Sequence, residues 1–416
     1  MFVQLAAKSL WSRKSSVLLT LLAISVSVFV LLGIEHVRYQ TKQSFSQTVS
    51  GVDLIVGART GDINLLLYSV FRLGDATNNI GWNTYQTIAN NDSVAWTIPL
   101  SLGDSHQGYR VLGTTKDYFT HFHYGQNQSL VFKEGREFTS PFEVVLGSEV
   151  AKKLGYDIGS TLVLAHGIAK HSFTIHKDNP FTVVGILQPT GTPVDDTLHV
   201  SLAGIEAIHT DWNNGVPAAH SSAHHDVSNV DLTPKSITAF MVGLNSKMAT
   251  FKLQRAINDY QKEAVMAILP GVTLTKLWSM MRVLEQSLRL VSALVLVAAL
   301  LGLGAMLLAS MRERRSEISI MRCLGASPSF IFSLVLIEAL LITFVACIIA
   351  VVTLVSLLGL GKDFVLDQFG LMLTMNIFNQ QTMVLLTMVL ASALLVSVIP
   401  AISAYRQALH GSLNQS

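Results

Sequence analysis

The stretch that decides the fold is FIFSLVLIEALLITFVACIIAVVTLVSLLGL at residues 330–360, which holds 31 residues and a single charged one, Glu338. About 20 apolar residues cross the hydrocarbon core of a bilayer as a helix, so this run predicts a membrane span. The uncharged runs at 17–34, 290–311 and 382–405 are long enough for the same role. Only 13% of the chain is charged, about half of the share in soluble domains. We therefore expect four membrane helices, one near the start of the sequence and three near its end.

The run at 17–34 also resembles the apolar core of a cleaved signal peptide, because Lys and Arg residues precede it. It is long for such a core, and no Ala-x-Ala cleavage site follows it. We therefore expect an uncleaved membrane anchor.

Charge and cysteine content exclude two classes of protein. The net charge of +2 is too small for a nucleic-acid binder that neutralises many phosphates. The two cysteines, Cys323 and Cys347, cannot build a disulfide framework.

Basic residues beside the spans predict the orientation of the chain, since cytoplasmic flanks carry an excess of Lys and Arg. Eight lie before the first span, between the second and third, and after the fourth, whereas the connection at 361–381 holds only Lys362. We therefore expect both termini to be cytoplasmic and the segment 36–289 to lie outside. The eight residues are Lys8, Arg13, Lys14, Arg312, Arg314, Arg315, Arg322 and Arg406.

The long segment at 36–289 is predicted to form an α+β domain. Runs rich in Val, Thr, Ile and Phe at 143–147, 161–165, 181–187 and 237–244 predict strands, and 148–153 predicts a helix. The polar, His-rich stretch at 215–234 predicts a mobile loop or a seam between two subdomains. A stripe at three- and four-residue spacing predicts an amphipathic helix through Leu253, Ile257, Tyr260, Ala264 and Ile268.

These features divide the chain into eight predicted parts. A cytoplasmic amphipathic helix and the first span occupy 1–35, and the extracytoplasmic α+β domain, with the option of two subdomains, occupies 36–289. The other parts are the second span at 290–311, a cytoplasmic segment at 312–328, the third span at 329–360, a short outer loop at 361–381, the fourth span at 382–405 and a cytoplasmic tail at 406–416.

The cytoplasmic connection at 312–327 reads RERRSEISIMRCLGAS. It predicts a short charged helix that ends at Gly325, with Ile318, Met321 and Leu324 on one stripe. Such a helix is suited to dock into a groove of a cytoplasmic partner, and the alternative is a solvated loop that follows the positive-inside tendency. Because the sequence has no G-x-x-x-x-G-K-[ST] phosphate loop, we expect nucleotide chemistry to come from a partner.

The pattern R-x-x-E-I-x-x-x-R-x-x-G-A-S in this connection resembles the coupling segment of MacB/FtsX/LolC-type ABC transporter permeases, also called type VII or mechanotransmission transporters. The stretches AKSLWSRK at 7–14, VLGSEVAKKLG at 145–155, IGSTLVL at 158–164 and PAISAYR at 400–406 resemble further parts of the same family. In this sequence the coupling pattern falls on Arg314, Glu317, Ile318, Arg322, Gly325, Ala326 and Ser327.

The resemblance implies an α-helical membrane protein with four transmembrane helices, one plus three, and a large MacB-like periplasmic domain, in the bacterial inner membrane. It implies a permease subunit without its own enzymatic activity. The implied partners are a cytoplasmic ABC ATPase dimer that binds ATP and Mg²⁺, a second permease copy in a homo- or heterodimer, a periplasmic adaptor or lipoprotein, and the lipid bilayer. No cofactor is expected in this chain itself.

The resemblance also implies that the periplasmic domain moves when the ATPase hydrolyses ATP. This motion would export or extract a lipoprotein, a peptide, a small hydrophobic compound or a metal-linked cargo from the periplasm or the outer leaflet. The alternative is an FtsX-like signalling subunit that activates a periplasmic partner without transport. A membrane-anchored enzyme is a weaker third class, because the outer segment has no G-x-S-x-G or zincin pattern.

Glu338 is the one ionisable residue inside the third span. A carboxylate at the centre of a membrane helix costs about 3 kcal/mol unless it is paired or near the interface. We expect it to pair with a basic residue such as Arg312 or Arg13, while a proton relay is disfavoured because no second acid or His lies in a span.

The segment at 63–73, INLLLYSVFRL, predicts a helix that is apolar on nearly every side. Burial inside the outer domain is one explanation, and contact with substrate or membrane is the other. The residues that would make that contact are Leu66, Leu67, Val70 and Phe71.

Twelve of the thirteen histidines lie between His36 and His225. The cluster HSSAHHD at 220–226 offers three imidazoles and a carboxylate, and neutral imidazoles suit Zn²⁺ or Cu²⁺. Zinc capture by His220, His224, His225 and Asp226 is therefore a hypothesis, and a solvated polar loop is its alternative.

Overall fold

The computed structural model describes residues 10–11, 13–48, 50–167, 179–209, 212–213, 216–217, 231–313, 315–369 and 377–410. The chain divides into two compact units. The helical unit contains the residues up to Gln40, Arg282–Phe364 and those from Leu373 onward. The α+β unit contains Thr41–Met281 together with Val365–Met372.

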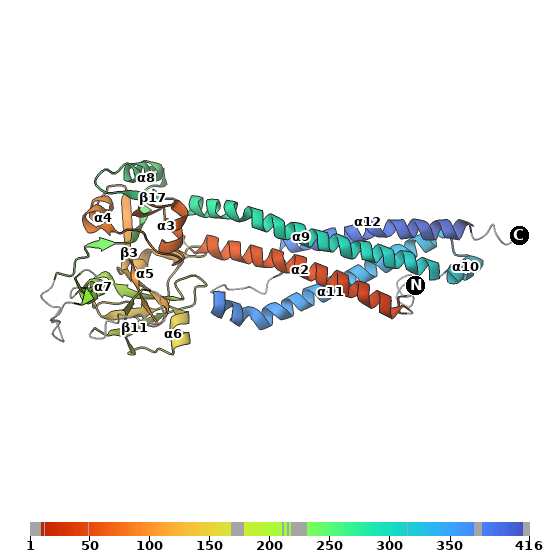
Figure 1. Ribbon diagram of the computed structural model, residues 1–416, viewed down its shortest axis with the longest axis horizontal. Helices are drawn as coiled ribbons and strands as arrows, with labels where there is room; N and C mark the ends of the chain where they lie inside the picture. Colours follow the sequence, from red (N-terminus) through yellow and green to blue (C-terminus); the bar gives the residue numbers. More distant parts are fainter. Residues whose placement is uncertain are drawn as a thin grey trace. The chain divides into compact units, whose positions relative to one another are not determined.

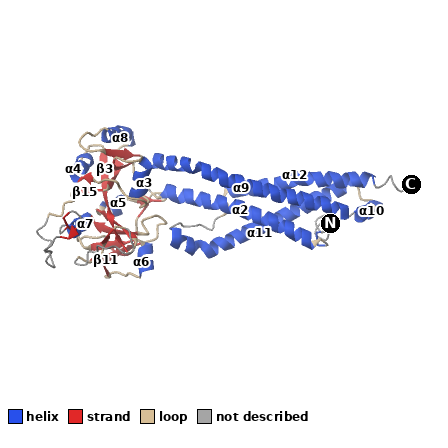
Figure 2. Cartoon of the chain, in the orientation of Figure 1, coloured by secondary structure: helices blue, strands red, loops and turns tan. Residues whose placement is uncertain are grey.

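Four long helices form the helical unit, with one short helix between the second and third (Figures 1 and 2). Each long helix contains a stretch that is long and apolar enough to cross a membrane, so the four predicted spans are confirmed as membrane-type helices. The helices are α2 (Lys14–Gln47), α9 (Pro270–Glu313), α10 (Arg315–Cys323), α11 (Pro328–Phe369) and α12 (Gln380–His410).

The long helices extend beyond the apolar runs that identified them. Helix α9 begins at Pro270, 20 residues before the predicted span at 290–311. Helix α11 continues to Phe369, so the predicted loop at 361–381 begins inside a helix, which corrects its boundary. Hydropathy marks where apolar side chains stop, whereas backbone hydrogen bonding continues as long as the residues tolerate a helix.

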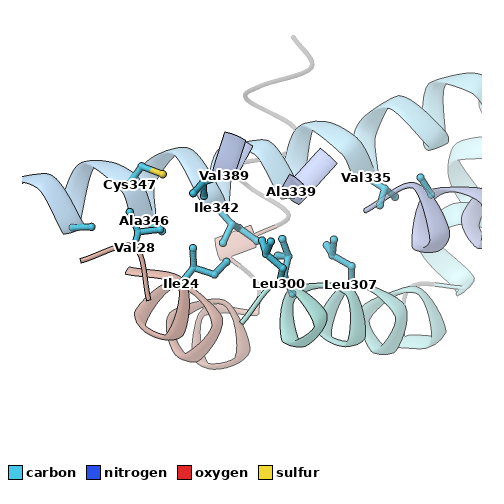
Figure 3. Packing of buried hydrophobic residues seen from close by; sticks show 14 of the residues in the cluster. Ile24, Val28, Leu300, Leu307, Val335, Ala339, Ile342, Ala346, Cys347 and Val389 are labelled. Carbon is cyan, nitrogen blue, oxygen red and sulfur yellow. The ribbon is translucent and has the colours of Figure 1, made fainter. Parts of the chain in front are cut away.

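The core of the helical unit is apolar and contains many small residues. Figure 3 shows Ile24 of α2, Leu300 and Leu307 of α9, Ile342 of α11 and Val389 of α12 in one cluster. Small side chains allow close approach of membrane helices, and the buried positions of α12 include Ala393, Ala401, Ala404 and Ala408.

The outward-facing side chains of this unit are also apolar. Leu294 is 60% exposed, Phe344 53% and Leu395 73%. Contiguous apolar surface of this kind is unfavourable in water and favourable against lipid chains. The surface chemistry therefore agrees with a membrane location.

Eleven of the described strands of the α+β unit form one mixed sheet in the order β17-β1-β16-β3-β4-β12-β8-β11-β7, with β10 paired to β3 and β9 to β11. The pairs β4/β12 and β8/β11 are parallel, and the other pairs are antiparallel. The strands are β1 (Leu54–Ala58), β3 (Val94–His106), β4 (Tyr109–Thr114), β7 (Phe132–Gly135), β8 (Glu143–Leu146), β9 (Thr161–Leu162), β10 (Ala165–His166), β11 (Phe181–Leu187), β12 (Thr197–Ser201), β16 (Ala239–Leu244) and β17 (Val265–Ile268).

Six α-helices pack in this unit, and six two-residue strands form three small pairs among the described residues. The helices are α3 (Asp62–Ser69), α4 (Trp82–Ala89), α5 (Asp117–His121), α6 (Ser148–Leu154), α7 (Leu202–His209) and α8 (Thr250–Asn258), with a 3₁₀ turn η2 (Lys247–Ala249). The short pairs are β2 (Ile80–Gly81) with β15 (Ser236–Ile237), β5 (His123–Tyr124) with β6 (Gln128–Ser129), and β13 (Trp212–Asn213) with β14 (Val216–Pro217).

Strand β1 is buried along its whole length because both of its faces are covered. Successive side chains of a strand point to opposite faces. Ile55 joins the core cluster that contains α3 residues, whereas Leu54 and Val56 join the cluster that contains residues of α4 and α8. This explains why β1 reads as a continuous apolar run.

Most of the predicted elements of this unit are confirmed. Strands β8 and β11 and helix α6 match their predicted ranges within a residue, and the strand predicted at 161–165 is divided into β9 and β10. The amphipathic helix is shorter than predicted. Helix α8 ends at Asn258, and Ile268 belongs to β17. The apolar residues beyond Tyr260 therefore keep the helical spacing only by chance, because they lie in a strand that follows the helix.

Candidate functional site

The connection between α9 and α11 folds as the short helix α10, as the sequence predicts. Arg314 lies outside the described residues, and the side chain of Glu317 is also not described. Ile318 is only 5% exposed and belongs to the core cluster of the helical unit. Met321 is partly buried against the same cluster. These two side chains attach α10 to the membrane helices.

The turn after α10 explains the spacing of three motif residues. Gly325 has a φ of +93°, which an L-residue rarely adopts. The Ala326 N–H donates to the Met321 carbonyl at 2.9 Å, and the Gly325 N–H donates to the Arg322 carbonyl at 3.0 Å. This pair of bonds is the Schellman ending of a helix. The Arg322 guanidinium donates to the Ala326 carbonyl at 3.0 Å, so it closes the same turn.

Two large apolar side chains of this connection are exposed, one on α10 and one in the turn that follows it. Ile320 is 59% exposed and Leu324 is 83% exposed. The sequence placed Leu324 on one stripe with Ile318 and Met321, and this is wrong. The helix ends at Cys323, so Leu324 leaves the stripe at the turn and is exposed together with Ile320.

The predicted pairing of Glu338 is confirmed. An Nη2 atom of Arg13 lies 3.5 Å from Oε2 of Glu338, whose side chain is fully buried. Arg312 and Arg13 were the two predicted partners, and this contact is made by Arg13. The pair joins the start of α2 to α11.

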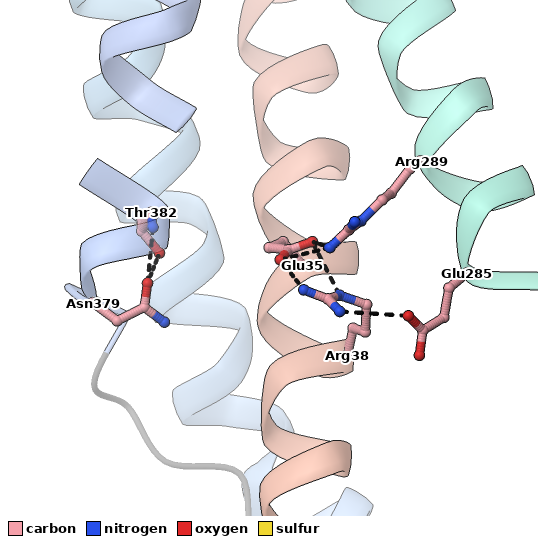
Figure 4. Close-up of polar contacts among 6 residues, drawn as sticks. All are labelled: Glu35, Arg38, Glu285, Arg289, Asn379 and Thr382. Atoms are coloured by element: carbon pink, nitrogen blue, oxygen red, sulfur yellow. Dashed lines mark hydrogen bonds and ion pairs between the residues drawn. The ribbon is translucent and has the colours of Figure 1, made fainter. Parts of the chain in front are cut away.

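A four-residue charge network that was not predicted from the sequence joins α2 to α9 (Figure 4). Arg289 Nη2 donates to both carboxylate oxygens of Glu35 at 3.3 Å. Arg38 pairs with Glu35 and also donates to Glu285 at 3.4 Å. Each helix contributes one acid and one base, at spacings of three and four residues that could have signalled a network.

Figure 4 also shows how α12 begins. The Asn379 side-chain oxygen accepts from the Thr382 N–H at 2.8 Å and from the Thr382 hydroxyl at 2.9 Å. This is an N-cap interaction, which satisfies a backbone donor of the first turn. It fixes the point at which the last membrane helix starts.

The apolar segment at 63–73 lies in the core of the α+β unit. Leu66 is 2% exposed, Val70 5% and Phe71 6%, and Leu67 packs partly buried against the same cluster. Helix α3 packs so closely on β1 that a Cβ on Gly57 would lie 2.5 Å from Leu65. Burial therefore explains the apolar character of this segment. A substrate or membrane contact through it stays an untested prediction that the burial does not favour.

The proposed zinc ligands at 220–226 lie outside the described residues, so the zinc hypothesis stays a prediction. Among the described residues, no group of three or more His, Cys, Asp or Glu side chains could hold a metal ion. Two described histidines, His106 and His199, are buried in the α+β unit. Burial lowers the pKa of His106, and burial together with the nearby Arg72 lowers the pKa of His199 to about 3.

Comparison with known proteins supports the resemblance. The family model of the MacB-like periplasmic core domain matches residues 17–260, more than half of the chain, and the model of the FtsX-like permease C-terminal region matches residues 289–410. No curated protein matches the sequence.

Two solved structures are similar to part of the chain. The periplasmic region of MacB from Actinobacillus actinomycetemcomitans is 13% identical, with 55% of this chain and 94% of that chain covered and a TM-score of 0.36. The extracellular domain of the noncanonic ABC-type transporter YknZ from Gram-positive bacteria is 13% identical, with 52% and 98% covered and a TM-score of 0.31.

Proposed function

The chain belongs to the FtsX/MacB family of ABC-transporter permeases, and we propose that it is the membrane subunit of a transporter whose ATPase is a separate cytoplasmic protein. A dimer of that ATPase would bind ATP and Mg²⁺ and hold α10 of this chain and of a second permease copy. Closure of the ATPase dimer would then displace α10.

The observation that carries this proposal is the division of α10 into two faces. Ile318 is buried in the helical unit, whereas Ile320 and Leu324 are exposed. Exposed apolar side chains on a short helix and in the turn that ends it are suited to anchor the segment in a groove of a partner protein. We assign these two residues as contacts to the ATPase.

Displacement of α10 would be transmitted because the core of the helical unit is closely packed. Ile318 shares one cluster with residues of α2, α9, α11 and α12. Packed cores change between discrete arrangements and do not absorb movement by local compression. A shift of α10 would therefore reposition the membrane helices.

The interior of the helical unit favours a substrate that is handled outside the membrane, by export or extraction of a lipoprotein, a peptide or a small hydrophobic compound. Several buried hydroxyls donate to backbone carbonyls of their own helices, so these hydroxyls are paired without water. These bonds are Ser27 to Ala23, Ser292 to Leu288, Thr343 to Ala339 and Ser397 to Leu394.

The proposal is tested with the double variant Ile320→Asp/Leu324→Asp in membranes that also contain the ATPase. We expect the variant to insert normally but to lose co-purification of the ATPase and stimulation of ATP hydrolysis. Cys323→Asp is the matched control, because it adds a charge at another exposed position of α10. A double variant that retains and stimulates the ATPase as the wild type does would overturn the assignment.

A further inference from the structure

A groove of about 550 Å³ lies between α9 and α12. It is lined by Leu308 of α9 and by Ile399, Ile402, Ser403, Arg406 and Gln407 of α12. None of its lining residues belongs to α10.

The residues of α12 that line the groove change in polarity along the helix. They are spaced by three, one, three and one residues, so they occupy a single helical face. Ile399 and Ile402 come first, and Ser403, Arg406 and Gln407 follow. The groove is therefore apolar at one end and rich in hydrogen-bonding groups at the other.

Arg406 supplies the charge of the polar end. It is exposed, and among the described residues it forms no hydrogen bond or ion pair. A guanidinium presents several donors in a planar fork that fits the oxygens of a phosphate. Ser403 adds a hydroxyl and Gln407 adds an amide on the same face.

The apolar end continues along α12 as an exposed stripe. Leu395 is 73% exposed and Met388 is 59% exposed, on the face that carries Ile399 and Ile402. From Arg406 back to Met388 the helix rises about 27 Å at 1.5 Å per residue. This length accommodates an acyl chain that runs from a headgroup into the hydrocarbon.

We propose that this groove binds an anionic phospholipid of the surrounding bilayer, with its phosphate at Arg406 and an acyl chain along Ile402 and Ile399. Basic pockets between membrane helices are known sites for anionic headgroups. A second copy of the chain fits less well, because a two-fold contact through this groove would place two Arg406 side chains near each other.

The proposal is tested with the full-length chain in detergent, without the ATPase, so that the outcome does not depend on the coupling proposal. Phosphatidylglycerol and phosphatidylcholine are titrated separately, and bound lipid is counted by native mass spectrometry. Loss of one basic contact at a membrane surface costs ~1 kcal/mol, so Arg406→Gln should weaken phosphatidylglycerol binding about fivefold. Phosphatidylcholine has the same phosphate, but its choline cation cancels the negative charge, so it should bind the wild type more weakly and lose less affinity in Arg406→Gln.

Lys14→Gln is the matched control, because Lys14 is an exposed basic residue on α2 that does not line the groove. It should leave phosphatidylglycerol binding unchanged. Ile402→Trp, which narrows the groove without changing its charge, should also displace the lipid.

Three outcomes would overturn the proposal. The first is equal phosphatidylglycerol binding by the wild type and Arg406→Gln. The second is displacement of the bound lipid by millimolar inorganic phosphate, which would identify a free anion as the ligand. The third is disulfide cross-linking between two chains through Ile402→Cys in a Cys323→Ser background, which would identify a second copy as the occupant.

Discussion

Replacing Gly325 with Ala tests whether the turn after α10 must keep its shape for coupling. Gly325 has a φ of +93°. No neighbouring atom lies within 4 Å of the position that its Cβ would occupy, so the substitution introduces no clash. The penalty is therefore backbone strain alone, ~1–2 kcal/mol for an L-residue in the left-handed region.

This penalty lowers the equilibrium constant for forming the turn by about 5- to 30-fold. If the ATPase binds α10 only when the turn is formed, its affinity falls by up to the same factor while the membrane helices remain folded. Asn adopts a positive φ more readily than Ala does. We therefore expect the affinity of Gly325→Asn to lie between those of the wild type and Gly325→Ala.

The assay is a titration of the purified ATPase onto the permease in lipid nanodiscs, with ATP hydrolysis as a second measurement. Gly361→Ala is the matched control, because Gly361 lies in α11 and also has open space at its Cβ position. There the same change favours the helix by ~0.5–1 kcal/mol. Unchanged affinity in Gly325→Ala, or an equal loss in Gly361→Ala, would refute the reasoning.

Three further predictions concern ionisable groups. Burial lowers the pKa of His199 from 6.5 to about 3, so as the pH falls this histidine is protonated in the unfolded chain before it is protonated in the folded chain. At pH 5 this difference lowers the free energy of unfolding by about 2 kcal/mol. His199→Phe should remove this part of the pH dependence in unfolding experiments. The hydrogen bond from Arg136 lowers the pKa of Glu143 to about 2, so Glu143→Gln should be less stable than the wild type at pH 7, and the difference should vanish as the pH falls from 4.5 to 2. Arg13→Ala removes the ion pair of buried Glu338 and should cost ~3–5 kcal/mol, most of it restored by adding Glu338→Gln, as measured by thermal unfolding in detergent.

The membrane helices could be predicted from the sequence because their signal is strong. A run such as 330–360 has few structural alternatives once its length exceeds the hydrocarbon thickness. That Glu338 pairs with a basic residue followed from the same physics, because a carboxylate buried among apolar helices requires a partner. The sequence left Arg312 and Arg13 as candidates, and the structure shows the contact with Arg13.

Features that depend on tertiary packing could not be predicted from periodicity. The spacing of Leu253, Ile257 and Ile268 fits one helix, but only the first two lie in α8. The apolar side chains of α3 fit both burial and client binding, and only the close approach of α3 to β1 favours burial.

The connection at 312–327 contains motif residues that shape the end of α10 and non-motif residues that are exposed. Arg322, Gly325 and Ala326 bond to one another or to the end of the helix, so they fix the direction of the chain after Cys323. Ile320 and Leu324 make the exposed apolar face. A motif that specifies geometry can stay the same while the contact face changes to suit a different ATPase. If α10 binds an ATPase as proposed, the choice of ATPase should therefore depend on the side chains at 320 and 324, and exchange of these two residues alone should change it.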